Sequence, residues 1–532
     1  MRSLLLASAA ATALGLGLAG PAGAFDLTIL HTNDVHDRFE PINKSSSTCS
    51  DKEAAEKACF GGAARLATAI DEGRAAGGNV LVLDAGDWFQ GTLFYTRYKG
   101  EATAAMVDRL GYDAMAVGNH EFDDGPPVLA RFARALKTPL LSANIDPANE
   151  TDLPGDLILP STVVEVGGER IGIIGLTTPD TPDIASTGEV AFEPPAVAVK
   201  REIDALGAQG INKIVVLSHL GYVPDQKLAA EVDGIDVIVG GHSHTLLGDM
   251  EGAEGKYPTL VKAPDGTDVP IVTAQSYSKY LGDLTITFDD AGKVTAASGA
   301  PRLLDASVAE DPETLAVVEE LAKPLDEIRN KVVASIPSPI DGSRETCRKG
   351  ECQMGNLVAD ALLERTAPQG VTIALINGGG LRASIDAGEV TQGEVLTVLP
   401  FLNTVATFQL SGQGILDALE NGMSQVEEGG GRFPQVAGLQ VDWSHAPEPG
   451  KGRIKAVRVR QGDAWVPIDP AKTYSVVSND FMRRGGDGYD VFVTAKNAYD
   501  FGPPMDQVVA DYLASKNGAY TPYVDGRITK VE

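Results

Sequence analysis

The sequence predicts an α/β protein with two domains, and three observations carry this prediction. Between residue 25 and about 290, short aliphatic or β-branched runs alternate with alanine-rich segments of helical spacing. Each run ends abruptly in polar residues, and a charged helical segment separates this region from a second one. Apolar runs of this length are typical of strands buried on both faces. A chain of 532 residues is also too long for one hydrophobic core.

The first domain, residues 25–309, contains the clearest strand candidates. Segments 62–74 and 195–207 have the composition and spacing of helices that separate strands. The candidate strands are Leu27–Leu30, Val80–Leu83, Ala114–Val117, Ile171–Ile174, Ile214–Leu217 and Val237–Val239. The carboxyl ends of parallel strands meet at one edge of a sheet, so we expect the polar strand ends to form a site there.

A linker helix is predicted over residues 310–334, followed by a second domain over 335–532. The linker opens with acidic residues and then places Leu315, Val318, Leu321 and Leu325 at helical spacing. In the second region a helix begins near Met354, residues 371–376 read as a buried strand, and 412–423 read as another helix. A second α/β or α+β domain fits this pattern.

The first 24 residues have the pattern of a signal peptide. Arg2 precedes an apolar run over residues 4–19, and small residues end at Ala24. The run is short for a bilayer span and is broken by Gly15 and Gly17. We therefore expect an exported protein, periplasmic or extracellular, with no membrane span.

The net charge of −29 argues against nucleic-acid polymers as partners, because phosphate backbones require a basic face. A small phosphate ester can bind only where metal ions or arginines reverse the local field. The composition leaves the oligomeric state open.

The four cysteines lie in two close pairs, Cys49 with Cys59 and Cys347 with Cys352. An exported chain normally oxidises such pairs, so two local disulfides are expected. The alternative is a four-cysteine zinc site, but the pairs lie far apart in the chain and neither has C-x₂-C spacing.

Five strand ends of the first domain carry residues typical of metal ligands, and five of the seven histidines lie in these sets. Two metal ions about 3.5–4 Å apart need one bridging carboxylate and further ligands on each side. Asp87 is the natural bridge. The ligands expected on one metal are Asp34, His36 and His244, and those on the other are Asn119, His219 and His242. Mixed nitrogen and oxygen ligands suit Zn, Mn, Co or Fe and do not select among them.

Two strings in this region, Ile29–His36 and Gly118–Asp123, resemble the signatures of the 5′-nucleotidase branch of the calcineurin-like metallophosphoesterases. The resemblance implies a four-layer α/β/β/α first domain. It also implies that His120, paired with Asp123, is not a metal ligand but stabilises the transition state or protonates the leaving oxygen. A histidine oriented by a carboxylate three residues later is a plausible acid on chemical grounds as well. His31 lies in the first string, and we expect it to be a packed histidine.

Four segments of the second half extend the resemblance over nearly all of the mature chain. They are Cys347–Leu357, Asn377–Arg382, Leu399–Phe401 and Asn479–Tyr489. The resemblance implies that Arg348 and Arg382 bind phosphate, that Phe401 and Phe481 sandwich the base, that Asp487 holds the ribose, and that Asn377 contacts base or sugar. Guanidinium groups do recognise phosphate through paired donors, and a base offers two flat faces for stacking.

The resemblance implies hydrolysis of nucleotide phosphate esters by a water activated by two metal ions, with AMP-type substrates and with ADP or ATP as further candidates. Alternatives on the same two domains are a 2′,3′-cyclic-nucleotide phosphodiesterase and a UDP-sugar hydrolase. A nucleotide-binding or adhesion protein is the non-enzymatic alternative. Arg483 and Arg484 depart from the family pattern; facing the cleft they would favour substrates with more phosphates, and otherwise they are solvated.

Overall fold

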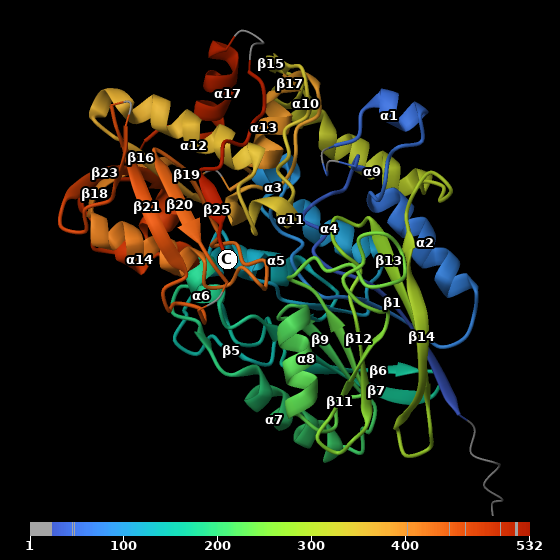
Figure 1. Ribbon diagram of the computed structural model, residues 1–532. Helices are drawn as coiled ribbons and strands as arrows, with labels where there is room; N and C mark the ends of the chain where they lie inside the picture. The colour runs from blue at the N-terminus through green and yellow to red at the C-terminus, as the bar shows by residue number, and fades with distance from the viewer. Residues whose placement is uncertain are drawn as a thin grey trace, which may run out of the picture.

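The computed structural model describes residues 24–532 apart from residues 45, 47, 402, 446, 463, 501 and 517–519. Residues 1–23 of the predicted signal peptide lie outside the described residues. The first half of the chain forms one lobe and the second half forms the other, with a helical linker along one side (Figure 1). None of the described helices has the length and apolar composition needed to cross a membrane.

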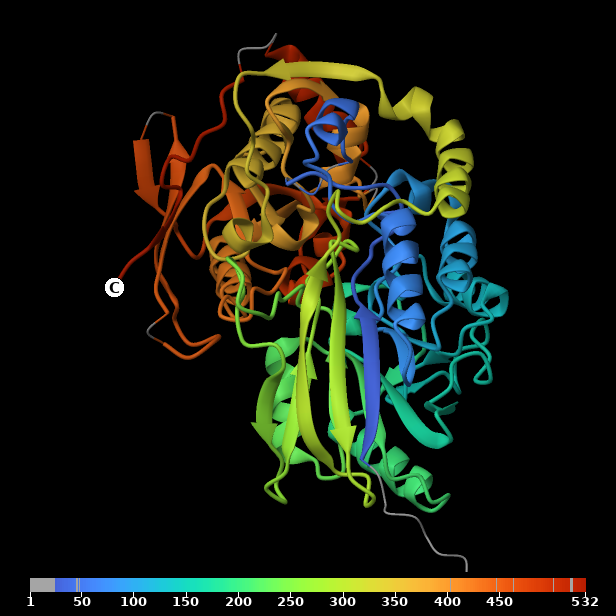
Figure 2. The ribbon, with the colours of Figure 1, turned by 90° about the vertical axis from the view of Figure 1, so that its right-hand side faces the viewer.

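Two six-stranded sheets form the first domain. The first sheet has the order β14-β13-β1-β2-β3-β4, with bounds Val294–Leu303, Tyr280–Phe288, Phe25–Thr32, Val80–Asp84, Ala114–Ala116 and Leu140–Leu141. The second has the order β11-β12-β10-β9-β7-β6, with bounds Thr259–Lys262, Asp268–Val272, Val237–Gly240, Ile214–His219, Glu169–Thr177 and Ser161–Val166. The long strands β1, β13 and β14 run side by side in Figure 2.

The two sheets pack face to face, because both faces of their strands are apolar. Leu27 and Ile29 of β1 are buried between the sheets with Val215 and Leu217 of β9. Leu30 points the other way, into a core shared with helices α2 (Ala63–Ala75) and α4 (Glu101–Leu110). Helices α7 (Pro195–Gly207) and α8 (Tyr222–Glu231) cover the outer face of the second sheet. The predicted four-layer α/β/β/α architecture is confirmed.

The strand ends that carry polar residues belong to both sheets. Asp34, Asp87 and Asn119 follow β1, β2 and β3 of the first sheet. His219 ends β9 and His242 follows β10, both in the second sheet. The expectation of a single sheet edge is therefore wrong, because the apolar pattern alone cannot assign a strand to one of two stacked sheets. The two edges lie next to each other, so the residues still meet.

The linker consists of α9 (Pro312–Ala322), a 3₁₀ turn over Lys323–Leu325 and α10 (Asp326–Arg329). Asp311 caps α9 by accepting a hydrogen bond from Thr314 N–H at 2.7 Å. Pro324, which lacks an amide donor, lies in the 3₁₀ turn that separates the two helices. Strand β15 (Val332–Ile336) begins inside the predicted linker range, where Val332 pairs with Thr391 of β17 (Gly388–Thr391).

The second domain is α+β. Its larger sheet has the order β19-β16-β23-β18-β24, with bounds Pro434–Ala437, Ile373–Asn377, Thr473–Asn479, Val405–Ser411 and Lys496–Tyr499. A four-stranded sheet, β22-β21-β20-β25, has bounds Ala464–Pro467, Ile454–Gln461, Leu439–Trp443 and Ile528–Lys530. Helices α12 (Gln353–Thr366) and α17 (Met505–Ser515) pack in one core, and α14 (Gly412–Gly422) packs in another.

Both cysteine pairs are disulfides in the structure. Cys49–Cys59 closes a loop of the first domain and Cys347–Cys352 closes a loop of the second, with Cα–Cα distances of 5.8 and 5.0 Å. Neither pair belongs to a four-cysteine site.

Candidate functional site

The seven residues predicted as metal ligands gather where the strand ends of the two sheets meet. We call them the metal-type cluster: Asp34, His36, Asp87, Asn119, His219, His242 and His244. His219 Nε2 lies 3.1 Å from Asp87 Oδ2, and His244 Nε2 lies 3.2 Å from Asp34 Oδ1. His242 Nδ1 lies 2.8 Å from Asn119 Oδ1. The structure therefore brings together all seven residues that the sequence singled out.

Backbone carbonyls orient the histidine rings of the cluster. His36 Nδ1 faces the carbonyl of Phe89 at 3.0 Å, and His219 Nδ1 faces the carbonyl of Ala85 at 2.6 Å. A carbonyl only accepts, so each Nδ1 carries a proton and each Nε2 faces the cluster. Holding the second ring nitrogen in this way is the usual support for an imidazole that binds metal.

Metal ions fit this donor set. Three groups of ligand atoms lie close enough to share an ion: Asp34, His36 and His244; Asp87, His219 and His242; and His36, Asp87 and His120. The buried atoms Asp34 Oδ1 and His219 Nε2 have no hydrogen-bond partner among the described residues. Buried polar atoms are almost always satisfied, so these two atoms, one from each of the first two groups, suit binding to cations.

The charge states of the cluster also suit cations. Desolvation lowers the pKa of the His36 and His244 rings well below the usual value and that of His242 to about 3. These rings are therefore neutral near pH 7, the form that binds metal. Burial alone would raise the pKa of the Asp87 carboxyl, but His219 and His120 lower it well below its usual value.

The backbone of the cluster is strained. Five of its members, none of them glycine, have left-handed backbone angles: Asp34, His36, Asp87, His242 and His244, with φ between 51° and 68°. Each such residue costs on the order of 1–3 kcal/mol and persists only where the surrounding structure holds it. A Cβ on Gly118 would lie 2.2 Å from Asp87 Oδ1, so only glycine fits beside the bridging candidate. Strain of this kind concentrates at functional sites.

Glu121 supports the cluster, although the sequence analysis gave it no role. Its buried carboxylate accepts hydrogen bonds from the backbone amides of Asp87, Trp88, Phe89 and Gly118 at 2.7–3.1 Å. It therefore fixes the loop that carries Asp87. The sequence feature that could have indicated this role is the position of Glu121 inside the string Gly118–Asp123.

His120 opens a 3₁₀ turn (His120–Phe122) directly after β3 and the ligand candidate Asn119. Its Nδ1 lies 2.8 Å from Asp123 Oδ2, and its Nε2 lies 3.9 Å from Asp87 Oδ2. Burial lowers the pKa of His120, but Asp123 and Asp87 together raise it above the usual value. This histidine can therefore hold a proton at the edge of the cluster.

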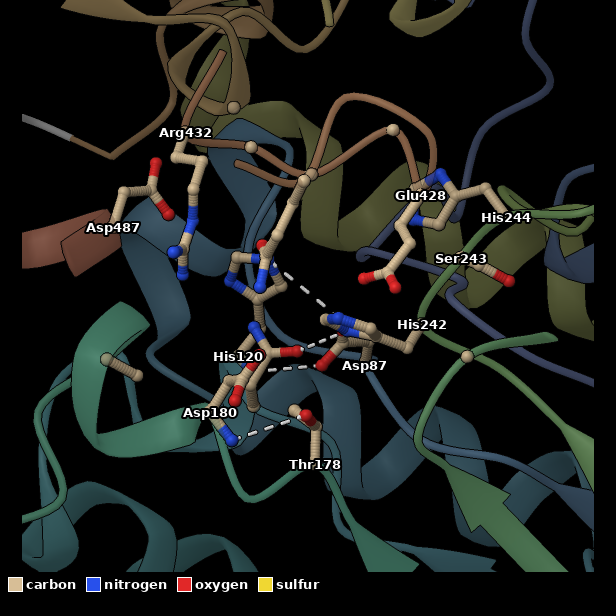
Figure 3. Close-up of a pocket in the computed structure, with 18 of the residues that line it drawn as sticks. Asp87, His120, Thr178, Asp180, His242, Ser243, His244, Glu428, Arg432 and Asp487 are labelled. Atoms are coloured by element: carbon tan, nitrogen blue, oxygen red, sulfur yellow. Dashed lines mark hydrogen bonds and ion pairs between the residues drawn. The ribbon is translucent and has the colours of Figure 1, made fainter. Parts of the chain in front are cut away.

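The cluster opens into a cavity of about 1160 Å³ that both domains line. In Figure 3, Asp487 and Arg432 project from the second domain toward His120 and Asp87 of the first. The ring of Phe401, from the second domain, lies 5.7 Å from the ring of His120.

Five of the described arginines of the second domain line the cavity, and three of them lie close to one another: Arg344, Arg348 and Arg382, here called the arginine group. Arg382 Nη2 donates to His36 Nε2 at 3.1 Å, so this group touches the metal-type cluster. Among the described residues, no carboxylate lies within ion-pair distance of any of the three. Burial and the neighbouring arginines lower the pKa of Arg348. Unpaired buried cations of this kind require an anion.

Sequence reasoning missed Arg344. It lies four residues before Arg348, at the start of the short helix α11 (Arg344–Cys347), and this i, i+4 spacing was the only available signal. It also missed Arg432, which lines the cavity and donates to Asn421 Oδ1 at 3.3 Å. No sequence pattern marks Arg432.

Phe401 and Phe481 are both half-buried and both line the cavity. A Cβ on Gly486 would lie 2.5 Å from the Phe481 ring, so the ring rests directly on the Gly486 backbone. Asp487 Oδ2 accepts from Asn377 Nδ2 at 2.6 Å. The structure therefore brings together the four residues that were expected to bind the nucleoside.

Arg483 and Arg484 point in different directions. Arg483 Nε lies 3.5 Å from Asp500 Oδ1, and only Arg484 lines the cavity. Arg484 is largely exposed and pairs with Asp480 Oδ2 at 2.5 Å. His31 is buried, and its Nε2 lies 2.8 Å from the Tyr257 hydroxyl.

The metal-type cluster suits two cations, and the arginine group beside it has no carboxylate partner in the described part of the chain. This combination is typical of sites that hydrolyse phosphate esters. By class, the protein is a metal-dependent phosphoesterase.

Comparisons with known proteins give the family. Residues 27–246 match the calcineurin-like phosphoesterase family, and residues 332–494 match the 5′-nucleotidase C-terminal domain family. The chain is 39% identical to 5′-nucleotidase of Homo sapiens, over 97% of this chain and 93% of that protein. It is 37% identical to snake venom 5′-nucleotidase of Naja atra, over 95% and 99%. The crystal structure of 5′-nucleotidase precursor from Thermus thermophilus superposes with a TM-score of 0.90, at 42% identity, over 95% of this chain and 99% of that one. The chain belongs to the 5′-nucleotidase family, as the two strings of its first domain predicted.

Proposed function

We propose that the protein is a 5′-nucleotidase that hydrolyses nucleoside 5′-monophosphates to a nucleoside and phosphate. The observation that carries the proposal is the shared cavity. The metal-type cluster lies at one end of the cavity, and the arginine group lies against it. The rings of Phe401 and Phe481 and the carboxylate of Asp487 line the side that the second domain forms. A nucleoside monophosphate offers the matching groups in the same order.

The family fold implies divalent metal ions, and the residues of the metal-type cluster suit two of them. Asp34, His36 and His244 would hold one ion, Asn119, His219 and His242 the other, and Asp87 would bridge them. The ions would activate the attacking water and neutralise charge on the phosphoryl oxygens. The nitrogen and oxygen donors are compatible with Zn, Mn, Co or Fe.

His120 provides the proton for the leaving group. Asp123 holds the Nδ1 proton, which leaves the protonated Nε2 free to face the cavity. As water adds to phosphorus, the bond from phosphorus to the ribose 5′ oxygen breaks, and His120 Nε2 donates a proton to that oxygen. Asp123 stabilises the charged ring until the proton leaves.

The second domain binds the rest of the substrate. Arg348 and Arg382, joined by Arg344, supply paired donors to the phosphate. Phe401 and Phe481 stack on the base, Asp487 accepts hydrogen bonds from the ribose hydroxyls, and Asn377 orients Asp487.

Two other enzymatic activities are alternatives on this fold, a 2′,3′-cyclic-nucleotide phosphodiesterase and a UDP-sugar hydrolase. A larger nucleotide is supported by the similarity to the NAD nucleotidase of Haemophilus influenzae, with a TM-score of 0.58 and 27% identity, over 95% of this chain and 99% of that one. A cavity of about 1160 Å³ leaves room for such a substrate. A purely nucleotide-binding or adhesive role is disfavoured, since all seven cluster residues are present.

We also propose that residues 1–24 are a cleaved signal peptide and that the mature protein is periplasmic or extracellular. Two disulfides support export, as do relatives described as a venom protein and as a precursor. The proposed domain bounds are 25–309 for the phosphoesterase domain, 310–334 for the linker and 335–532 for the substrate domain.

The test is phosphate release by the purified, metal-loaded protein from AMP, ADP, ATP, UDP-glucose and 2′,3′-cyclic AMP. AMP should give the highest kcat/KM. Preference for the cyclic nucleotide or the nucleotide sugar would replace the proposal with the corresponding alternative, and no release from any of them would contradict an enzymatic role.

A further inference from the structure

Three buried side chains of the second domain form a chain of hydrogen bonds that leads to the proposed ribose carboxylate. Asn479 Nδ2 donates to Asn377 Oδ1 at 2.9 Å, and Asn377 Nδ2 donates to Asp487 Oδ2 at 2.6 Å. The three residues are 1%, 5% and 6% exposed. We call this chain the amide relay.

The other end of Asn479 is also engaged. Asn479 is the last residue of β23, and its Oδ1 accepts from the backbone amide of Met482 at 2.7 Å. It is therefore the N-cap of α15 (Asp480–Arg483), the helix that carries Phe481. The Asn479 side chain thus fixes the start of the helix that carries Phe481. Through Asn377 it also holds the carboxylate of Asp487.

We propose that Asn479 is a positioning residue that couples the base-stacking ring of Phe481 to the ribose-binding carboxylate of Asp487; this rests on the nucleoside-binding role proposed above. Asn479 does not line the shared cavity and acts only through its neighbours. Its contribution is geometric: it sets the direction of the hydrogen bonds in the relay.

The direction of the relay follows from the donors and acceptors. Asn479 Oδ1 faces an amide N–H, so its NH₂ group must point toward Asn377. Asn377 then presents its oxygen to Asn479 and its NH₂ group to Asp487. Asp487 Oδ2 is satisfied, and Oδ1 is left without a hydrogen bond from any described side chain, available to a ribose hydroxyl. The left-handed backbone of Asp487, with φ of 57°, depends on such outside support.

Asn479→Asp separates the two roles of this side chain. Aspartate is as good an N-cap as asparagine, so α15 keeps its first turn. The new carboxylate has no N–H to give Asn377, whose amide must then turn its NH₂ group toward position 479. Its oxygen then faces Asp487 Oδ2, two acceptors in contact, and Asp487 must move.

We expect Asn479→Asp to weaken adenosine binding, measured by calorimetry, and to lower kcat/KM for AMP by roughly 10- to 100-fold, the size of effect that follows when a binding group moves by about 1 Å. The loss should lie mainly in KM, because the ribose contact is made before and during the reaction. The kcat/KM for glycerol phosphate, an alkyl ester without a base or ribose, should fall far less than that for AMP.

Ser411→Asp is the matched control. Ser411 caps α14 in the same domain by accepting from Gly414 N–H at 3.1 Å and is exposed, so the change adds the same charge at another helix start. This variant should leave kcat/KM for AMP and for glycerol phosphate unchanged. Asn479→Ser keeps a capping oxygen and also loses the amide donor to Asn377, so it provides a second variant if Asn479→Asp folds poorly. It should likewise lower kcat/KM for AMP more than kcat/KM for glycerol phosphate.

A double-mutant cycle with Asp487→Asn tests the relay itself. The amide introduced at position 487 can present either an oxygen or an NH₂ group to Asn377, so Asn479→Asp should cause little further loss in that background. Equal losses on AMP and glycerol phosphate, unchanged adenosine affinity, or additive effects in the cycle would overturn the proposal. Because adenosine carries no phosphate, wild-type binding of adenosine without AMP hydrolysis would contradict the proposed function and leave this inference standing.

Discussion

The two ends of the cavity are built in different ways. In the metal-type cluster, backbone carbonyls and strained loops after individual strands orient the side chains, as for His36 and His219. At the other end, the proposed nucleoside wall of Phe401, Phe481, Asp487 and Asn377, side chains hold one another, as Asn479 holds Asn377 and Asn377 holds Asp487. Both ends join distant segments of the chain, through backbone carbonyls in the first end and through side chains in the second. Changes in the cluster should therefore affect all substrates, and changes in the wall should affect recognition.

The two ends also differ in charge. The cluster combines carboxylates with imidazoles, of which His36, His242 and His244 are neutral, and the arginine group next to it carries positive charge without a matching carboxylate among the described residues. On a chain with a net charge of −29, this is the local reversal of field that a phosphate ester needs. The proposed function would place the phosphate at the boundary between the ends, where Arg382 meets His36.

The largest effect is expected for Asp87→Asn, because both proposed cation positions would use this carboxylate. Loss of several kcal/mol of transition-state stabilisation lowers kcat/KM by about 10³-fold or more, equally for AMP and glycerol phosphate. Removal of metal with a chelator should abolish both activities, and added Zn or Mn should restore them. Full activity after exhaustive dialysis against chelator would contradict the two-metal account.

His120→Asn is expected to lower kcat by about 10²–10⁴-fold, the usual contribution of acid–base assistance. Metal content, measured by elemental analysis, should stay at the wild-type level, because His120 is proposed to donate a proton and not to hold the ions. A variant that loses metal along with activity would make His120 a ligand instead.

Phe401→Ala and Phe481→Ala are expected to act on nucleotides alone. Loss of one stacking face costs roughly 1–3 kcal/mol, which is about 5- to 150-fold in kcat/KM for AMP. Activity on glycerol phosphate should change little. Equal losses on both substrates would mean that these rings stabilise the domain and do not bind a base.

The smallest effect is expected for Arg484→Ala. Arg484 is exposed and paired with Asp480, on the same wall as Phe481, whereas the arginine group lies at the other end of the cavity. The ratio of ADP to AMP activity should change by less than about fivefold, the upper range for an exposed ion pair. A tenfold or larger drop in ADP activity would instead give Arg484 a role in binding a second phosphate.

The sequence predicted the cluster well because each of its residues directly follows an apolar strand run, a pattern visible in the one-dimensional order. It could not predict that the strands belong to two sheets, since both sheets show the same apolar pattern. Arg344 was missed because its spacing of four residues from Arg348, on a helix of a single turn, does not show that both side chains line the cavity. Asn479 and Asn377 lie far apart in sequence, and only the pairing of β16 with β23 places them in contact.

The most direct test of this division between the two ends is the ratio of kcat/KM for AMP to kcat/KM for glycerol phosphate in two variants, His120→Asn and Phe481→Ala. Both substrates release an alkoxide, so the loss of the proton donor should lower both rates and leave the ratio near that of the wild type. Loss of the aromatic face should lower the ratio about 5- to 150-fold. An unchanged ratio in Phe481→Ala, or a ratio that falls equally in both variants, would contradict the account.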